Sequence, residues 1–294
     1  MTTSPAQKKS GFAALIGRSN VGKSTLLNAL VGTKVAITSP KPQTTRQAIQ
    51  GIVHDPRGQI VFVDTPGVFE KARDPLTKHM NAAARDALQG VDLVIYVVDP
   101  TREIGNEEHI VLRMLDGVTA PKILAINKTD LRNLPFVEEY KALADRFDRV
   151  VEISALRHLN LKPLVDAAIE LLPKGEPFYP EYQFSNIDHR FWLSELIREK
   201  LFIQLQQELP YSTAVEIDEV EDRETNDGKK IRYIKARILT NGDQYKRMII
   251  GAGGRKIKEI GWATRKELEQ ILDTRVFLEL EVEVDPDWML RMGA

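Results

Sequence analysis

The chain has 294 residues, enough for two domains, and an apolar fraction of 43% that is ordinary for folded protein. Its 41 lysines and arginines nearly balance its 42 aspartates and glutamates, so overall charge indicates no particular partner and a nucleic-acid surface must come from local clustering. The absence of cysteine excludes disulfides, thiolate metal sites and a cysteine nucleophile, and suits a reducing cytosol. The polar N-terminus lacks the apolar core of a signal peptide, and no run approaches the roughly 20 apolar residues of a spanning helix.

Residues 11–172 alternate short apolar strands with helical stretches, after a polar segment, residues 1–10, that we expect to be a flexible tail. The predicted strands are 12–16, 60–63, 93–98, 123–126 and 150–153, with 48–53 as an antiparallel edge strand. Near-continuous apolar strands separated by helices are typical of a mostly parallel sheet with helices on both faces. The sequence therefore predicts an α/β domain over 11–172.

A change of pattern follows this region. Residues 173–187 hold several prolines and a glycine, which a helix cannot continue through, so we expect a linker. Residues 188–294 then show a long amphipathic helix at 190–209, strands at 213–221 and 231–239, a short helix, a helix at 255–272 and a closing strand at 276–284. This αββααβ order predicts a second, smaller α+β domain.

The most informative motif is a phosphate-binding loop, because the run from Gly17 to Ser24 fits G-x-x-x-x-G-K-[ST] between a predicted strand and a predicted helix. Backbone N–H groups and the helix N-terminus then point together at anionic oxygens. We expect Lys23 to reach the β- and γ-phosphates and the Ser24 hydroxyl to bind Mg²⁺. The predicted nucleotide-binding residues here are Gly17, Arg18, Ser19, Asn20, Val21, Gly22, Lys23, Ser24 and Thr25.

A second phosphate motif, Asp64-Thr65-Pro66-Gly67, follows the predicted strand 60–63. A carboxylate at this strand end can hold Mg²⁺ through water, and the Gly67 N–H can meet the γ-phosphate because a residue without Cβ allows close approach. The predicted nucleotide-binding residues here are Asp64, Thr65, Pro66, Gly67 and Val68. At the position of Val68 many GTPases carry the glutamine that orients attacking water. An apolar side chain cannot do this, so we expect slow intrinsic hydrolysis.

A third motif, Asn127-Lys128-Thr129-Asp130, follows strand 123–126 and indicates guanine rather than adenine. The Asp130 carboxylate can accept hydrogens from N1–H and the 2-amino group of guanine, a pair of donors that adenine lacks. After the next strand, a backbone N–H of Ser154-Ala155 can meet guanine O6. The predicted nucleotide-binding residues in this part are Asn127, Lys128, Thr129, Asp130, Ser154, Ala155 and Leu156.

The polar, proline-bearing segment 40–46 lies between the two phosphate motifs. We expect the Thr45 hydroxyl to join the Mg²⁺ ligands when the γ-phosphate is present, with Thr44 beside the nucleotide, which would make the segment a nucleotide-sensing switch. A plain flexible connection is the alternative. The predicted catalytic residues are thus Lys23, Thr45, Asp64 and Gly67.

In the second domain, a G-x-x-G turn lies between two helices and is followed by a basic helix. A glycine turn lets a nucleic-acid backbone approach, and the helix N-terminus favours phosphate, so the pattern predicts a KH-type RNA-binding module. Ile250, Ile257 and Ile260 are expected as an apolar floor for bases. Against a membrane-binding role for the basic helix, Ile257, Ile260 and Trp262 are expected to face the domain core. The predicted RNA-binding residues are Ile250, Gly251, Ala252, Gly253, Gly254, Arg255, Lys256, Ile257 and Lys258.

Together these residues resemble the Era family of bacterial GTPases, through GRSNVGKST, KPQTTR, DTPGV, NKTD and SAL in the first domain and a type II KH pattern in the second. One G domain followed by a KH module is specific to that family. The resemblance implies a P-loop GTPase fold joined to a type II KH domain. Two departures stand out: Ser19 replaces a usual proline, and Ala252 replaces a frequent lysine.

The resemblance further implies GTP hydrolysis with Mg²⁺, binding of 16S ribosomal RNA near its 3′ end, and a role in maturation of the 30S subunit. It implies a cytoplasmic protein with loose attachment to the inner membrane, and we expect a monomer. Asn20 matches the position of an asparagine that binds an activating K⁺ in related GTPases, so K⁺ is a candidate cofactor and Asn20 a candidate metal ligand beside Ser24, Thr45 and Asp64.

Two other readings remain open from the residues. One is a structural assembly factor that holds its nucleotide as a static cofactor. The other is a membrane-surface GTPase in which residues 255–266 form a basic amphipathic helix.

Overall fold

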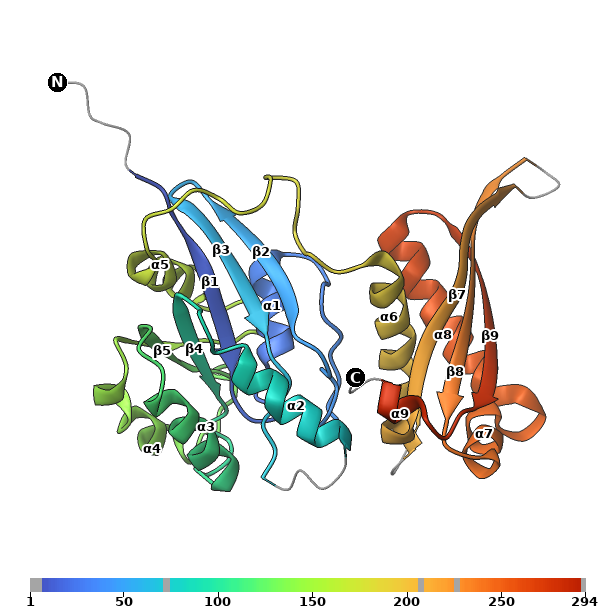
Figure 1. Cartoon of the computed structure of the whole chain (residues 1–294), viewed down its shortest axis with the longest axis horizontal. Helices are drawn as coiled ribbons and strands as arrows, with labels where there is room; N and C mark the ends of the chain where they lie inside the picture. The colour runs from blue at the N-terminus through green and yellow to red at the C-terminus, as the bar shows by residue number, and fades with distance from the viewer. Residues whose placement is uncertain (1–6, 71–74, 206–208, 225–227, 292–294) are drawn as a thin grey trace. The chain divides into compact units, whose positions relative to one another are not determined.

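The computed structural model describes residues 7–70, 75–205, 209–224 and 228–291. By their contacts the residues form two compact units (Figure 1). The first comprises Met1–Thr38 and Thr45–Ile187, and the second comprises Ser39–Thr44 and Asp188–Ala294. Within the described ranges no helix is both long enough and apolar enough to cross a bilayer.

The first unit is built on a six-stranded sheet of order β2-β3-β1-β4-β5-β6. Every neighbouring pair is parallel except β2 and β3, which are antiparallel. The prediction of a mostly parallel sheet with one antiparallel edge strand is therefore confirmed. The strands are β1 (Lys9–Ile16), β2 (Ile49–Asp55), β3 (Gly58–Asp64), β4 (Leu93–Val98), β5 (Lys122–Ile126) and β6 (Arg149–Glu152).

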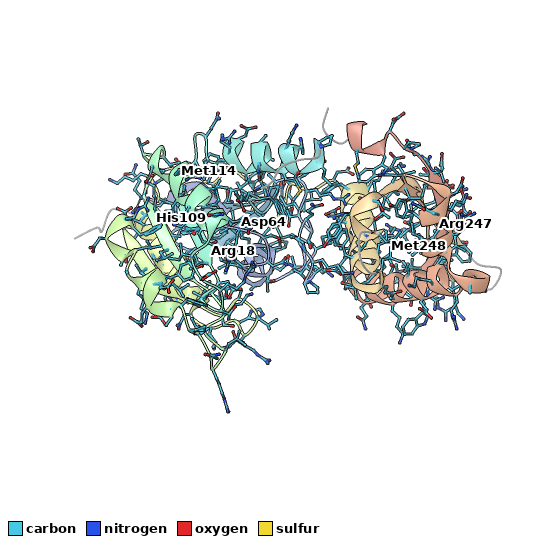
Figure 2. All side chains as sticks on the ribbon, turned by 90° about the horizontal axis from the view of Figure 1, so that it is seen from below. Arg18, Asp64, His109, Met114, Arg247 and Met248 are labelled. Atoms are coloured by element: carbon cyan, nitrogen blue, oxygen red, sulfur yellow. The ribbon has the colours of Figure 1, made fainter. Side chains whose placement is uncertain are left out.

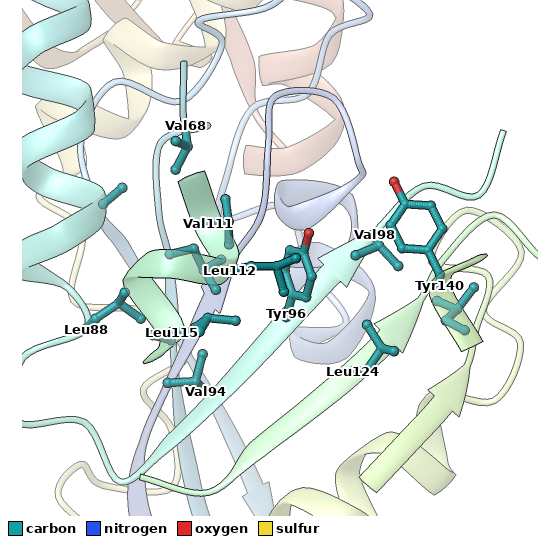
Figure 3. Packing of buried hydrophobic residues seen from close by; sticks show 14 residues of the cluster. Val68, Leu88, Val94, Tyr96, Val98, Val111, Leu112, Leu115, Leu124 and Tyr140 are labelled. Atoms are coloured by element: carbon teal, nitrogen blue, oxygen red, sulfur yellow. The ribbon is translucent and has the colours of Figure 1, made fainter. Parts of the chain in front are cut away.

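Helices cover both faces of this sheet (Figure 1). On one face α2, α3 and α4 pack on alternate residues of β1, β4 and β5, and Figure 3 shows Tyr96 and Val94 of β4 beside Leu112 and Leu115 of α3. Burying this apolar surface is the main driving force for the layer. The helices are α1 (Lys23–Val31), α2 (Pro75–Asp86), α3 (Asn106–Asp116), α4 (Val137–Lys141) and α5 (Leu161–Leu171), with a 3₁₀ turn η1 (Ala144–Arg146).

The ends of this unit differ from expectation. β1 begins at Lys9, inside the segment 1–10 expected to be a tail. The segment expected to be a linker, 173–187, is bound to the unit, because the Phe184 carbonyl accepts a hydrogen bond from the Ile52 N–H at 2.9 Å and Ser185 bridges to Gly51. The prolines of this segment exclude a helix, as expected, but they are compatible with an extended strip along the edge strand β2.

The second unit has the order α6-β7-β8-α7-α8-β9, which confirms the predicted αββααβ module. β7 and β8 pair antiparallel, and β9 adds parallel to β8. The elements are α6 (His189–Gln204), η2 (Leu209–Ser212), β7 (Thr213–Glu224), β8 (Lys230–Thr240), α7 (Asp243–Ile250), η3 (Ala252–Gly254), α8 (Arg255–Leu272), β9 (Arg275–Val284) and α9 (Trp288–Arg291).

The first helix of this unit is shorter than predicted. It starts where Asp188 caps it by accepting from the N–H groups of Arg190 and Phe191, and it ends at Gln204 rather than residue 209. Leu205 leaves the helix in an extended conformation and is buried in the apolar core with Ile197. Leu205 lies at a helical spacing from Leu201, so the sequence predicts that the helix continues through it. The sequence does not show that Leu205 reaches the core from an extended segment after the helix has ended.

Candidate nucleotide site and nucleic-acid groove

The phosphate loop joins β1 to α1, as predicted. Gly22 has φ 102°, and α1 starts at Lys23, so the loop delivers its N–H groups at a helix N-terminus, where anions are favoured. The Lys23 ammonium donates to the carbonyls of Gly17 and Arg18, both at 2.9 Å. Burial lowers the pKa of Lys23 to about 8, so the loop holds a cation that bound phosphates would stabilise.

The three predicted Mg²⁺-binding groups Ser24, Thr45 and Asp64 lie together. The Ser24 hydroxyl donates to Asp64 Oδ2 at 2.5 Å and lies 2.8 Å from the Thr45 hydroxyl, which is 3.5 Å from the same carboxylate oxygen. These residues are 19 to 40 positions apart in sequence. The fold therefore brings two hydroxyls and one carboxylate to a single point beside the phosphate loop.

The Asp64 carboxylate has features of a cation site. It is fully buried, and its second oxygen, Oδ1, has no hydrogen-bond partner in the described part of the chain. Burial raises the pKa of Asp64 to about 6, against the attraction of Lys23. Hydroxyl and carboxylate oxygens suit Mg²⁺, which completes its octahedron with waters and phosphates. Among described residues no His, Cys, Asp and Glu cluster offers another metal site, so the residues present fit Mg²⁺ held with a nucleotide.

The residues after Asp64 take two different positions. Gly67 packs on the phosphate loop so closely that an added Cβ would lie 2.7 Å from the Ser19 Cα, which explains why glycine is needed there. The buried Thr65 hydroxyl donates to the Leu15 carbonyl at 2.8 Å, which fixes the turn before Pro66. Val68 is fully buried in the apolar core of α2 and α3 (Figure 3). Its side chain is thus occupied in packing, whereas its backbone bridges to Arg18.

The expected guanine residues form one hydrogen-bonded group. Asn127 donates to the Val21 carbonyl at 2.8 Å and accepts from the Ala155 N–H at 2.9 Å. The Ser154 hydroxyl donates to Asp130 Oδ1 at 2.6 Å. These bonds orient the carboxylate at the carboxyl end of β5, while the Ala155 N–H, a candidate donor to guanine O6, is paired with Asn127. Leu156 is largely exposed.

Lys128 connects the expected guanine-binding motif to the phosphate loop. Lys128 pairs with Asp99 at 2.5 Å and donates to the Asn20 carbonyl at 3.1 Å. Asn20 itself has φ 65°, the left-handed conformation that asparagine tolerates better than most residues. Thr129 donates its N–H to the Ile153 carbonyl, which holds the motif against the end of β6.

Two further residues predicted to bind nucleotide, Thr44 and Arg18, have side chains engaged elsewhere. The Thr44 hydroxyl bonds within its own segment, to the Ser39 hydroxyl and the Lys41 carbonyl, both at 2.7 Å. The Arg18 guanidinium is 4% exposed and pairs with the buried carboxylate of Glu108 on α3, with Nε 2.7 Å from Oε1. Figure 2 marks Arg18 and Asp64 in this unit. Arg18 thus fixes the loop to α3, and Glu108 is a site residue that the sequence did not reveal.

The nucleic-acid groove of the second unit follows the glycine turn. Gly253 and Gly254 have φ 59° and 74°, and an added Cβ at either would meet open space, so the turn is exposed and takes a backbone conformation that favours glycine. Residues 255–258 form the first turn of α8, with their basic side chains exposed or half-buried. Arg247 and Met248 of α7 lie before the turn (Figure 2).

A groove of about 350 Å³ runs between α8 and β9. Ile257 and Lys258 line it. Ile260 is fully buried, which agrees with the expectation that it faces the core and leaves it unable to provide a floor for bases. The expectation that Trp262 faces the core is wrong, because Trp262 is 54% exposed. The groove is lined by Ile257, Lys258, Gly261, Trp262, Arg265, Phe277, Leu278 and Leu280. Sequence periodicity places Phe277 and Trp262 on strand and helix, but it does not say that they are exposed.

Comparison with known proteins agrees with this geometry. A family described as 50S ribosome-binding GTPase matches residues 12–128, and the KH domain family matches residues 208–289. The GTPase Era of Halothermothrix orenii is 43% identical over 287 residues, covering 97% of this chain and 96% of the relative. The GTPase Era of Geobacter metallireducens is 45% identical over 283 residues, covering 95% and 94%.

This chain belongs to the Era family of GTPases. Solved structures of the family match both units. One is Era in complex with MgGDPNP and nucleotides 1506–1542 of 16S ribosomal RNA, with TM-score 0.89, 37% identity and coverage of 97% and 96%. Another is a tyrosine-to-alanine variant of Aquifex aeolicus Era bound to GDP·AlF₄⁻, with the same TM-score and identity and 96% coverage of each chain.

Proposed function

We propose that this GTPase binds GTP with Mg²⁺ in the first unit, binds 16S ribosomal RNA near its 3′ end in the second, and assists maturation of the 30S subunit as a nucleotide-dependent switch. Nucleotide binding is supported by the cluster of Ser24, Thr45 and Asp64, in which the buried Oδ1 of Asp64 has no hydrogen-bond partner among the described residues. Bound Mg²⁺ would neutralise phosphate charge at this point. The chain's own contribution is to position: Lys23 and the loop N–H groups hold phosphates, and Asp130 selects guanine.

The switch role rests on Thr45. Its hydroxyl already lies beside Ser24 and Asp64, so the γ-phosphate and Mg²⁺ would hold the segment before it, and their loss would release it. Hydrolysis is expected to be slow, because the buried Val68 cannot orient water. Multiple-turnover phosphate release tests the competing reading, in which the nucleotide is a static cofactor: release limited to one equivalent would favour that reading.

The RNA half rests on the glycine turn, the basic start of α8 and the adjacent groove, together with the solved relative that holds nucleotides 1506–1542 of 16S ribosomal RNA. The double substitution Gly253→Asp/Gly254→Asp tests it, because carboxylates at the exposed turn would repel phosphate. We expect labelled 3′-terminal 16S RNA to bind about 100-fold more weakly, which would correspond to losing several phosphate contacts. GDP affinity should stay unchanged, and loss of GDP binding would show that the two sites are misassigned.

Three finer proposals accompany this function. Asn20, in the phosphate loop, is proposed to bind K⁺ that accelerates hydrolysis, and equal hydrolysis rates in KCl and NaCl would exclude this. We propose a cytoplasmic monomer with peripheral attachment to the inner membrane. Co-sedimentation of the whole protein with anionic vesicles tests the attachment, and its molar mass in solution tests the monomer.

A further inference from the structure

Trp262 is an exposed aromatic side chain on α8, a helix that packs on the core through other residues. On α8 the residues Ile260, Thr264 and Leu268 are fully buried, whereas Trp262 is 54% exposed. The Lys266 ammonium lies 4.4 Å from the centre of the indole, a cation–π contact that holds the ring in place. A large aromatic held at the surface is informative, because apolar side chains of this size are usually covered.

Trp262 separates two hollows. One is the groove between α8 and β9, and the other, about 730 Å³, lies on the α6 side of α8 beside Gly253 of the glycine turn. Trp262 and Lys258 line both. The second hollow is lined by Gln204, Gly253, Arg255, Lys258, Glu259, Trp262 and Ala263. It therefore opens at the turn where an RNA backbone would pass, and its cations outnumber its single carboxylate.

The wall of this second hollow also carries unused hydrogen-bonding capacity. The Gln204 side-chain amide donates to the Glu259 carbonyl at 3.4 Å, and its Oε1 has no partner among the described residues. Because Oε1 is buried, a change of the Gln204 side-chain conformation is needed before this acceptor can meet the edge of a base. An aromatic ring, two cations and an amide are the groups with which proteins hold unpaired nucleotides.

We propose that Trp262 is the stacking platform for one unpaired nucleotide of the bound RNA. This nucleotide would lie in the hollow between α6 and α8, and the neighbouring nucleotides would lie in the α8–β9 groove. This proposal rests on the proposed RNA function and adds a binding position to it. A membrane surface fits the same face less well. A helix lying in a bilayer interface needs a continuous apolar face. On α8, Ile260 and Leu268 are buried in the core, which leaves Trp262 and Ile271 as the large apolar side chains exposed on this helix.

Binding of whole protein to a fluorescent RNA of 16S nucleotides 1506–1542 tests the proposal, with abasic sites introduced one at a time at its unpaired positions. We expect Trp262→Ala to weaken binding about tenfold and Trp262→Phe, which keeps an aromatic face, to weaken it about twofold. One abasic position should weaken wild-type binding about tenfold and leave Trp262→Ala unaffected. The control Ile271→Ala changes an exposed residue of the same helix outside both hollows and should have no effect.

Equal sensitivity of wild type and Trp262→Ala at every abasic position would overturn the proposal, because Trp262 would then not contact a base. A second result would also overturn it: Trp262→Ala with unchanged RNA affinity but reduced sedimentation with anionic vesicles. Failure of the wild type to bind this RNA would overturn the RNA function itself, and this proposal with it.

Discussion

The groups expected to bind nucleotide are hydrogen-bonded to one another, whereas the groups expected to meet RNA stand apart at the surface. In the first unit, Ser24, Thr45 and Asp64 share hydrogen bonds, and Asn127 links the phosphate loop to the segment after β6. In the second, Trp262 and Phe277 are each more than half exposed beside a shallow groove.

The difference has a physical cause. A small charged ligand such as a nucleoside triphosphate is bound by fixed dipoles and charges in a buried site, where each group is worth more than in water. A flexible RNA strand is held by charge and by stacking on exposed rings, which tolerate a loose arrangement. Substitutions in the first unit should therefore have large, specific effects, and those in the second smaller, additive ones.

The largest effect is expected for Asp130→Asn. The substitution removes two charge-assisted hydrogen bonds to guanine, so GTP affinity should fall roughly 10²–10⁴-fold. An asparagine amide can donate to the 2-carbonyl of xanthine, so xanthosine triphosphate should bind better than GTP to this variant. Displacement of a fluorescent GDP measures both affinities, RNA affinity without nucleotide is the control, and an unchanged GTP affinity would exclude Asp130 from the base site.

A smaller effect is expected for Glu108→Gln, which leaves the buried Arg18 guanidinium without its carboxylate. Breaking a buried ion pair costs about 3–5 kcal/mol of stability. Because Arg18 lies in the phosphate loop, we also expect GDP to bind about tenfold more weakly, the loss expected when a displaced loop N–H forfeits about one hydrogen bond to phosphate. The matched control is Glu138→Gln, which removes an exposed pair with Lys141 and should change neither quantity.

For this variant, stability follows from thermal unfolding and affinity from fluorescent GDP titration. Reduced stability with unchanged GDP affinity of the folded protein would mean that the pair is structural only.

The pH dependence follows from Asp64, whose pKa burial raises to about 6. The ionised carboxylate is the form that holds Mg²⁺, so the affinity for Mg²⁺·GDP should fall as pH decreases through 6, by about tenfold at pH 5. The control is the affinity of Asp64→Asn for Mg²⁺·GDP at each pH. This variant lacks the carboxyl, so its pH dependence shows the contribution of nucleotide protonation. An identical pH profile for the two proteins would contradict the prediction.

The same carboxyl affects the stability of the nucleotide-free protein in the opposite sense. Its folded pKa lies above its unfolded value, so it contributes stability at low pH that is lost as pH rises from about 4 to 6. Urea unfolding of wild type and Asp64→Asn between these pH values measures the difference.

The smallest effect is expected for Ala252→Lys in the exposed glycine turn. One added phosphate contact should strengthen RNA binding about threefold near physiological salt and steepen the dependence of log affinity on log salt by about 0.7. Ala252→Gln adds bulk without charge and is the control. An unchanged salt slope would indicate that RNA phosphate does not pass this turn.

The first unit was predictable from sequence in detail because its chemistry follows strand ends. The phosphate loop follows β1, Asp64 ends β3, and Asn127 follows β5, so apolar periodicity placed each motif at one edge of a parallel sheet. What could not be predicted lies in contacts between distant residues. Arg18 and Glu108 are 90 positions apart, and nothing in the sequence indicates that Arg18, expected at the nucleotide, pairs with a carboxylate on α3.

In the second unit, periodicity assigned the elements but not the exposure of their side chains. Ile260 and Trp262 are two positions apart on α8, about 200° around the helix, so they lie on opposite faces. Periodicity separates the two side chains, but it does not say which face packs on the core and which is left uncovered. Residues 173–187 likewise carry the composition of a linker, and nothing in that composition shows that Gln59 donates to the Tyr179 carbonyl and binds the segment to the sheet.

The most direct test of the switch is the affinity of the whole protein for labelled 3′-terminal 16S RNA, measured with GDP, with a non-hydrolysable GTP analogue and without nucleotide. A nucleotide-dependent switch should bind this RNA more tightly with the analogue than with GDP. Equal affinity in all three conditions would contradict it, because the chain would then carry two independent binding sites and no switch.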